Sequence, residues 1–167
     1  NGRIVQAGPA KDITVPADAQ ILDAKGLYTA PGLVDIHNHG SHEHLFCHEP
    51  MKCAEHFIRH GQTTVLPTFY CNLTAQEMLT GAQKLRDASR QGAGRIIGGL
   101  YMEGPYMNGV GSNQKYILWG GEISPQEYMP LVEDVKDLAR FWAVDPQRPG
   151  FEGFMRSVQE ADPDAIF

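Results

Sequence analysis

The sequence predicts an α/β fold in which parallel strands alternate with helices. Short runs of β-type residues are separated by stretches with helical periodicity, and each connection between strands is longer than a dozen residues. Connections of that length join parallel strands, whereas antiparallel neighbours need only a short turn. Two of the strands end in residues that can bind a metal, and functional residues at the carboxyl ends of strands are typical of a (β/α)8 TIM-type barrel.

The length of the chain is short for such a barrel. A full barrel has eight βα units in about 250 residues, and about four are recognisable here. The chain has 167 residues. We therefore expect the amino-terminal part of a barrel, with residues 31–167 forming its first four to five βα units. An open half of this kind exposes sheet edges, so we expect the isolated chain to be marginally stable or paired with another half.

Composition narrows the class of protein. With 42% hydrophobic and 20% charged residues, the chain is an ordinary globular sequence. The net charge is −6 and the 14 basic residues are scattered, which argues against nucleic acid and favours a small-molecule partner. No run approaches the ~20 apolar residues of a membrane span, and no leader is visible, so we expect a cytoplasmic protein. Three cysteines without paired spacing indicate reduced thiols.

The elements follow in chain order. Residues 1–30 carry β-type runs at 3–7 and 20–24, broken by glycine and proline, which indicate a small β unit. Residues 30–40 read as a buried strand. Further strands are expected at 63–68, 95–104 and 139–144, and a last one starting at 165. Helices are expected at 51–60, 74–91, 124–138 and 151–160, the second and third of them opened by capping boxes at Thr74/Glu77 and Ser124/Glu127.

The strand at 30–40 supplies the first candidate site. By alternation Asp35, His37 and His39 share one face, and two imidazoles at a strand end can reach one divalent ion before the chain turns at Gly40. Two histidines on a strand are also common as surface or satisfied core residues, and that alternative stays open from spacing alone.

All seven histidines fall between His37 and His60. Those at 42, 44 and 48 lie in a predicted loop, and those at 56 and 60 share a helix face. For these five, solvent exposure or capping of carbonyls is the commoner role.

The strand at 95–104 supplies the second candidate. Glu103 lies at its carboxyl end, on the same face as Tyr101, where a carboxylate could complete a metal site built from separate strands. In isolation an exposed strand-end glutamate is the simpler reading.

Two motifs carry a family resemblance. The stretch Pro-Gly-Leu-Val-Asp-Ile-His-Asn-His-Gly at 31–40 resembles the first-strand motif of the amidohydrolase superfamily. The stretch Gly-Leu-Tyr-Met-Glu-Gly-Pro-Tyr-Met-Asn at 99–108 resembles the Glu-Gly-Pro motif of the N-acetylglucosamine-6-phosphate deacetylases. The resemblance implies that residues 1–30 are a partial β-sandwich segment beside the barrel.

The resemblance also implies a site and a reaction. Glu103 would be the main metal ligand, joined by His37 and His39, with one or two divalent ions, zinc or iron. The reaction would be deacetylation of N-acetylglucosamine 6-phosphate, an amino-sugar phosphate, by a protein that is commonly a homodimer. Asp35 would orient the strand or accept a hydrogen bond rather than react.

The catalytic acid/base aspartate and two further histidines are expected beyond Phe167, so no catalytic residue is assigned on this chain. The isolated chain is therefore expected to be inactive.

One departure leaves the substrate open. After Asn108 the family usually has a Lys-Gly-Ala-His sequence, whereas this chain has a glycine-rich loop in which Gly111, Ser112 and Asn113 are candidate substrate contacts. The alternatives are another amidohydrolase, such as a dihydroorotase-like enzyme or an amino-acid deacylase, and a non-catalytic metal-binding or assembly fragment.

Overall fold

The computed structural model describes residues 3–109 and 115–167. The candidate contacts Gly111, Ser112 and Asn113 lie outside these residues. The chain divides into two compact units, residues 1–31 and residues 32–167. No helix in the described part of the chain is long and apolar enough to cross a membrane.

The first unit differs from the sequence prediction. Its described residues form one short 3-10 turn, η1 (Ala10–Asp12), and no strand. The runs at 3–7 and 20–24 are exposed, with Val5 97% and Leu22 93% accessible. The two predicted strands are therefore wrong for this structure, because a strand is stable only when a neighbour satisfies its backbone groups. The β-sandwich assignment of this segment stays a prediction.

The second unit is built on a parallel sheet in the order β1-β4-β5-β6. These strands are β1 (Leu33–Asn38), β4 (Gln62–Tyr70), β5 (Leu100–Glu103) and β6 (Ala139–Ala143). A parallel bridge from Phe141 to Ile166 continues the sheet beyond β6. The predicted α/β fold with parallel strands is thus confirmed.

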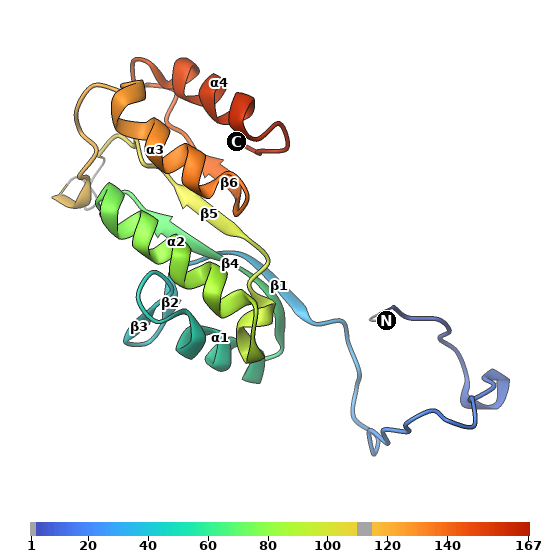
Figure 1. Ribbon diagram of the computed structural model, residues 1–167. Coiled ribbons are helices and arrows are strands. Elements are labelled where there is room, and N and C mark those ends of the chain that lie inside the picture. The colour runs from blue at the N-terminus through green and yellow to red at the C-terminus, as the bar shows by residue number, and fades with distance from the viewer. Residues whose placement is uncertain (1–2, 110–114) are drawn as a thin grey trace. The chain divides into compact units, whose positions relative to one another are not determined.

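Four helices connect the strands: α1 (Pro50–Arg59), α2 (Ala75–Ser89), α3 (Pro125–Val135) and α4 (Phe151–Ala161). Figure 1 shows α2 and α3 lying over the same face of the sheet, and neighbouring helices contact one another in chain order. A two-stranded antiparallel hairpin of β2 (Gly40–Ser41) and β3 (His44–Leu45) precedes α1, and a 3-10 turn, η2 (Gly92–Ile96), precedes β5.

The core lies between the sheet and its helices. Val65 and Phe69 of β4, Met102 of β5 and Trp142 of β6 are fully buried or nearly so. On the helix side they meet a set of buried residues from α2, α3 and α4, namely Met78, Leu85, Leu131, Val132, Val135 and Phe154. The cysteines at 47, 53 and 71 are free and buried.

Two expectations about strands were wrong. The first strand is not buried: Leu33, Val34 and Ile36 are 60%, 65% and 50% exposed. It lies at the edge of the described sheet, where apolar residues have a strand neighbour on one side only. The strand expected at 95–104 begins only at Leu100. Residues 92–96 form η2 instead, packed so closely on α2 that a side chain at Gly94 would meet the Ala88 carbonyl oxygen at 2.1 Å.

One of the two capping boxes forms. The Thr74 hydroxyl accepts a hydrogen bond from the Glu77 amide at 3.2 Å, and the Glu77 carboxylate accepts one from the Thr74 amide at 2.8 Å. At α3 the Ser124 side chain makes no capping hydrogen bond. The Glu127 carboxylate accepts a hydrogen bond of 2.6 Å from the Tyr106 hydroxyl. The carboxylate that a capping box would use is therefore engaged in a tertiary contact.

Candidate metal centre

The ends of β1 and β5 position the three predicted metal ligands. Parallel strands present their carboxyl ends at one edge of a sheet, and His37, His39 and Glu103 all lie at that edge. Strand β4 lies between β1 and β5, so β1 and β5 are about 10 Å apart. Imidazole and glutamate side chains are long enough to meet above β4, and here they do.

The distances show how closely the three side chains converge. Glu103 Oε2 lies 3.2 Å from His37 Nε2 and 3.1 Å from His39 Nε2. One ligand atom from each of the three residues lies within 4.8 Å of the others, and the described residues contain one such group. The imidazoles are 42% and 45% exposed and the glutamate is 23% exposed, so the group faces the solvent on one side.

The Glu103 oxygen that faces the imidazoles is buried and lacks a hydrogen-bond partner among the described residues. Its close approach to the His39 imidazole lowers the pKa of Glu103, against the opposing effect of burial, and the charge of His37 adds to the lowering. Neither Nε2 contact has hydrogen-bond geometry, so the interaction is electrostatic. A buried anionic oxygen between two imidazole nitrogens is the arrangement that a shared cation would satisfy.

Aromatic side chains pack around the imidazoles. The His37 ring lies 4.7 Å from the Tyr101 ring, which stacks on Phe141 at 5.7 Å. The His39 ring meets the edge of Tyr70 at 5.9 Å. Burial raises the pKa of Tyr70 to about 12, with smaller contributions from Cys71 and Glu103, so its phenol stays neutral beside the site.

Asp35 supports the strand instead of the imidazole rings. Its carboxylate accepts hydrogen bonds from the His37 amide at 3.1 Å, from Asn38 Nδ2 at 2.8 Å and from Gln62 Nε2 at 3.1 Å. The backbone N–H of Asn38 in turn donates to the Thr68 hydroxyl at 2.8 Å. These bonds cover the irregular register between β1 and β4 and fix the backbone that carries both histidines.

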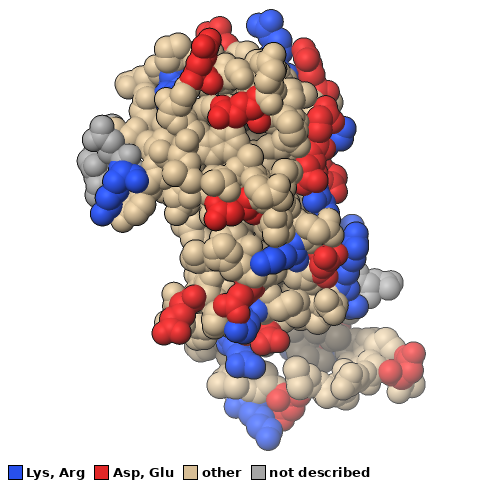
Figure 2. All heavy atoms as spheres, turned by 60° about the vertical axis from the view of Figure 1, so that its left-hand side comes forward, with Lys and Arg blue, Asp and Glu red and all other residues tan. Residues whose placement is uncertain are grey.

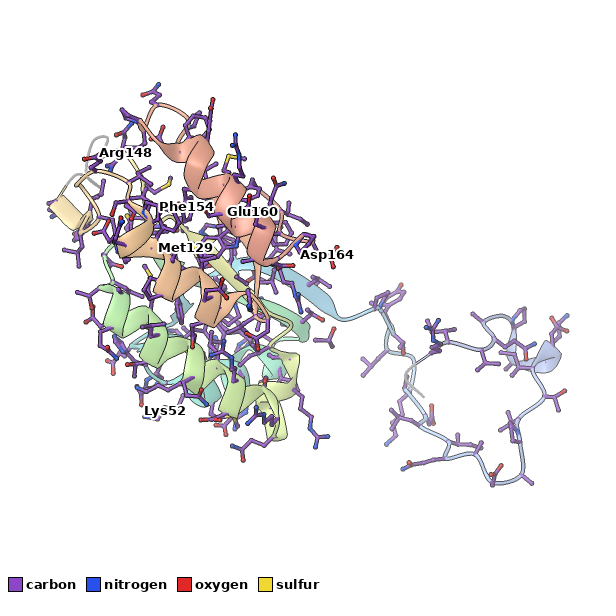
Figure 3. All side chains as sticks on the ribbon, turned by 45° about the horizontal axis from the view of Figure 1, so that its top comes forward. Lys52, Met129, Arg148, Phe154, Glu160 and Asp164 are labelled. Carbon is purple, nitrogen blue, oxygen red and sulfur yellow. The ribbon has the colours of Figure 1, made fainter. Side chains whose placement is uncertain are left out.

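The loop after Glu103 is attached to the loop before α4. Arg148, at the amino-terminal side of α4 in Figure 3, donates to the backbone carbonyls of Met107, Trp119 and Gly121 at 3.4, 3.2 and 2.5 Å. The Asp145 carboxylate accepts a hydrogen bond from the Asn108 amide at 3.0 Å. These bonds join the segment after β5 to the loop before α4.

The remaining histidines stay apart from the centre. His44 Nδ1 pairs with the Glu49 carboxylate at 2.6 Å. The His56 ring contacts the rings of His42 and His60 at the carboxyl-terminal part of α1. As the sequence suggested, a ring nitrogen of His60 binds a helix carbonyl, that of His56, at 2.8 Å.

Sequence reasoning missed Thr68 and Tyr70 at the site. Both line a hollow of about 200 Å³ beside His39, together with Leu45, Cys47, Asn72 and Leu73. The available signal was the alternation along β4, which places Thr64, Leu66, Thr68 and Tyr70 on one face. The predicted strand stopped at 68, whereas β4 runs to Tyr70.

Charged side chains are mixed on the visible surface. Figure 2 shows Lys and Arg scattered among Asp and Glu on that face of the molecule.

Comparison with known proteins supports the fold. No family model matches the sequence. A dihydroorotase from Geotalea daltonii is 50% identical over 38 residues, which are 23% of this chain and 8% of that protein. A crystal structure of N-acetyl-D-glucosamine-6-phosphate deacetylase from Mycobacterium smegmatis matches with a TM-score of 0.61 and 23% identity. That match covers 79% of this chain and 38% of the deacetylase chain, so the chain spans less than half of either relative. The resemblance that the two motifs indicated is confirmed in three dimensions: the chain has the fold of the amino-terminal part of an N-acetylglucosamine-6-phosphate deacetylase.

Proposed function

We propose that the chain is the amino-terminal part of a metal-dependent amidohydrolase that converts N-acetylglucosamine 6-phosphate to glucosamine 6-phosphate and acetate. The observation that carries the proposal is the convergence of His37, His39 and Glu103 at the carboxyl ends of two non-adjacent strands. The Glu-Gly-Pro sequence that begins with the last residue of β5 and the structural likeness to a deacetylase support this choice of substrate.

The donor set fits one or two ions of zinc or iron. Two imidazole nitrogens and a carboxylate oxygen are ligands that these metals accept, whereas Mg²⁺ and Ca²⁺ prefer oxygen alone. Three protein ligands with a solvent-exposed side are typical of catalytic sites. When bound, the ion would lower the pKa of its water to about 7 and polarise an amide carbonyl.

The residues of this chain have two roles in the proposal. His37, His39 and Glu103 hold the ion, and Asp35 with Thr68 fixes the strand that delivers the histidines. Proton transfer would be carried out by an aspartate that the family resemblance places after Phe167. The complete protein is proposed to act as a homodimer on the free amino-sugar phosphate.

A dihydroorotase-like activity on a cyclic amide is the second candidate. The observation that favours it is the 50% identity over 38 residues with the Geotalea dihydroorotase. Both candidates need the same metal centre, so the substrate must be tested separately from the metal.

The metal is tested by zinc and iron content of the purified chain, measured by elemental mass spectrometry. We expect near-stoichiometric metal in the wild type and a loss of one equivalent in Glu103→Gln, which keeps the size of the side chain. Glu133→Gln is the matched control, since Glu133 is an exposed carboxylate on α3 that pairs with Lys136. Full metal retention in Glu103→Gln would contradict the proposal.

The substrate is tested by thermal unfolding of the zinc-loaded chain with each candidate ligand. A ligand that binds the native state raises the melting temperature by mass action. We expect N-acetylglucosamine 6-phosphate to raise it and dihydroorotate to leave it unchanged. The reverse result would favour the ring hydrolase, and no effect of either compound would favour a non-catalytic metal-binding fragment.

A further inference from the structure

A second group of histidines lies outside the candidate metal centre. His56 and His60 are four residues apart at the carboxyl-terminal end of α1, and their ring centroids are 4.3 Å apart. His42, in the turn between β2 and β3, meets His56 edge-on with centroids 5.0 Å apart. We call His42, His56 and His60 the surface histidine cluster. His42 and His60 are exposed and His56 is half-buried.

The ring separations match those of imidazoles that share one metal ion. With a metal–nitrogen bond of 2.0–2.1 Å, an imidazole centroid lies about 3 Å from the ion, and two rings around a tetrahedral ion have centroids about 5 Å apart. Both separations in the cluster are close to this value. Histidines at i and i+4 also lie on one face of a helix, where both can reach the same ion.

His60 already has the hydrogen bond that a ligating histidine uses. Its Nδ1 lies 2.8 Å from the carbonyl oxygen of His56, so Nδ1 carries the proton and donates it. The opposite nitrogen, Nε2, is then unprotonated and has a lone pair available for a metal. Metal-binding histidines commonly donate their second ring nitrogen to a backbone carbonyl in this way.

The other two histidines are prepared for the same role. The half-buried His56 ring contacts both of the others, with centroids 5.0 Å from His42 and 4.3 Å from His60. His42 has a positive φ of 49°, which is unusual for a residue other than glycine. The hairpin that imposes this conformation contacts α1, and it presents the His42 ring to the helix.

We propose that the surface histidine cluster binds a divalent transition-metal ion, with zinc as the test ion, independently of His37, His39 and Glu103. Imidazole suits zinc, copper and nickel, and three imidazoles leave the fourth zinc position to water. The three ligand nitrogens are less convergent than those of the candidate metal centre. Rotation of the exposed His42 side chain, a motion of nanoseconds, would bring its ring nitrogen to those of His56 and His60 while His60 keeps its bond to the His56 carbonyl.

The test is titration calorimetry of the 167-residue chain with Zn²⁺ at neutral pH. We expect the wild type to bind one more equivalent than His56→Ala, and we expect His60→Ala to weaken that equivalent by at least about tenfold. His48→Ala is the matched control, because His48 is an exposed histidine of the same region outside the cluster. Far-UV circular dichroism of each variant verifies that it is folded.

Separate outcomes distinguish this cluster from the proposed catalytic centre. Glu103→Gln is expected to remove a different equivalent and to leave the one lost in His56→Ala. Equal zinc stoichiometry and affinity in the wild type, His56→Ala and His60→Ala would overturn the inference, whatever happens to Glu103→Gln. If His56→Ala fails to fold, NMR of the wild type decides the question. We then expect Zn²⁺ to shift the imidazole ¹⁵N resonances of His42 and His60. The absence of these shifts at saturating Zn²⁺ would also overturn it.

Discussion

Gly81 lies where two physical effects of the same substitution oppose each other. It is a buried residue within α2, and alanine is favoured over glycine in a helix by about 1 kcal/mol. A Cβ at this position would meet Phe69 Cζ at 2.7 Å and Cε2 at 3.0 Å. Phe69 is fully buried in β4, so its ring would have to move against neighbouring core side chains.

We therefore expect Gly81→Ala to lower the free energy of unfolding. Overpacking of a filled core costs about 1–3 kcal/mol, which exceeds the gain in helix propensity and leaves a net loss of about 1 kcal/mol. For a chain of this length that loss lowers the melting temperature by about 2–4 °C. Urea unfolding followed by circular dichroism and by the fluorescence of the two tryptophans measures the free energy, and thermal unfolding followed by circular dichroism measures the melting temperature.

Gly153 in α4 provides the matched control. No atom lies within 4 Å of a Cβ added there, so Gly153→Ala gains helix propensity without a clash and is expected to stabilise the chain by about 0.5–1 kcal/mol. The reasoning is refuted if Gly81→Ala stabilises the chain as much as Gly153→Ala does. That result would mean that the contact between α2 and β4 is looser than these distances indicate.

Three further predictions concern the same unit. Thr74→Ala removes the amino-terminal cap of α2 and is expected to cost about 1 kcal/mol in urea unfolding, whereas Thr74→Ser should keep most of it. Met102→Ala opens a cavity at a fully buried position of β5 and should lower the free energy of unfolding by about 2–5 kcal/mol. A loss under about 1 kcal/mol would mean that neighbouring side chains collapse into the cavity. The Arg86 guanidinium hydrogen-bonds the Asp137 carboxylate at 2.7 Å and lowers its pKa. A lowered carboxyl pKa stabilises the native state above the pKa of the unfolded chain, near 4, and this contribution is lost as pH falls through the lower native value. Arg86→Met should therefore reduce stability at pH 6, by under about 1 kcal/mol because Asp137 is largely exposed, and the difference should shrink at pH 3.

Local chemistry in the sequence was sufficient for the helices and for one of their caps. The helix at 75–89 has its cap, its periodic apolar face and its acidic first turn in neighbouring residues, so prediction needed no knowledge of the rest of the chain. The same pattern at Ser124 failed because Glu127 binds Tyr106, a partner 21 residues away that no local pattern reveals.

The candidate ligands were predictable because each is a strand-end residue within a recognisable motif. Alternation placed His37 and His39 together, and the Glu-Gly-Pro sequence singled out Glu103. That the three side chains meet follows from the sheet order, in which β4 lies between β1 and β5.

The sequence by itself predicted the four helices, the parallel α/β class and the three candidate ligands that the structure brings together, because periodicity and motifs are local properties of the chain. Tertiary structure alone decided the contacts between distant segments. It placed His42 against His56, left the runs at 3–7 and 20–24 without strand partners, and set Phe69 against Gly81. Such contacts depend on how whole elements pack, and packing is a property of the assembled core rather than of any short stretch of residues.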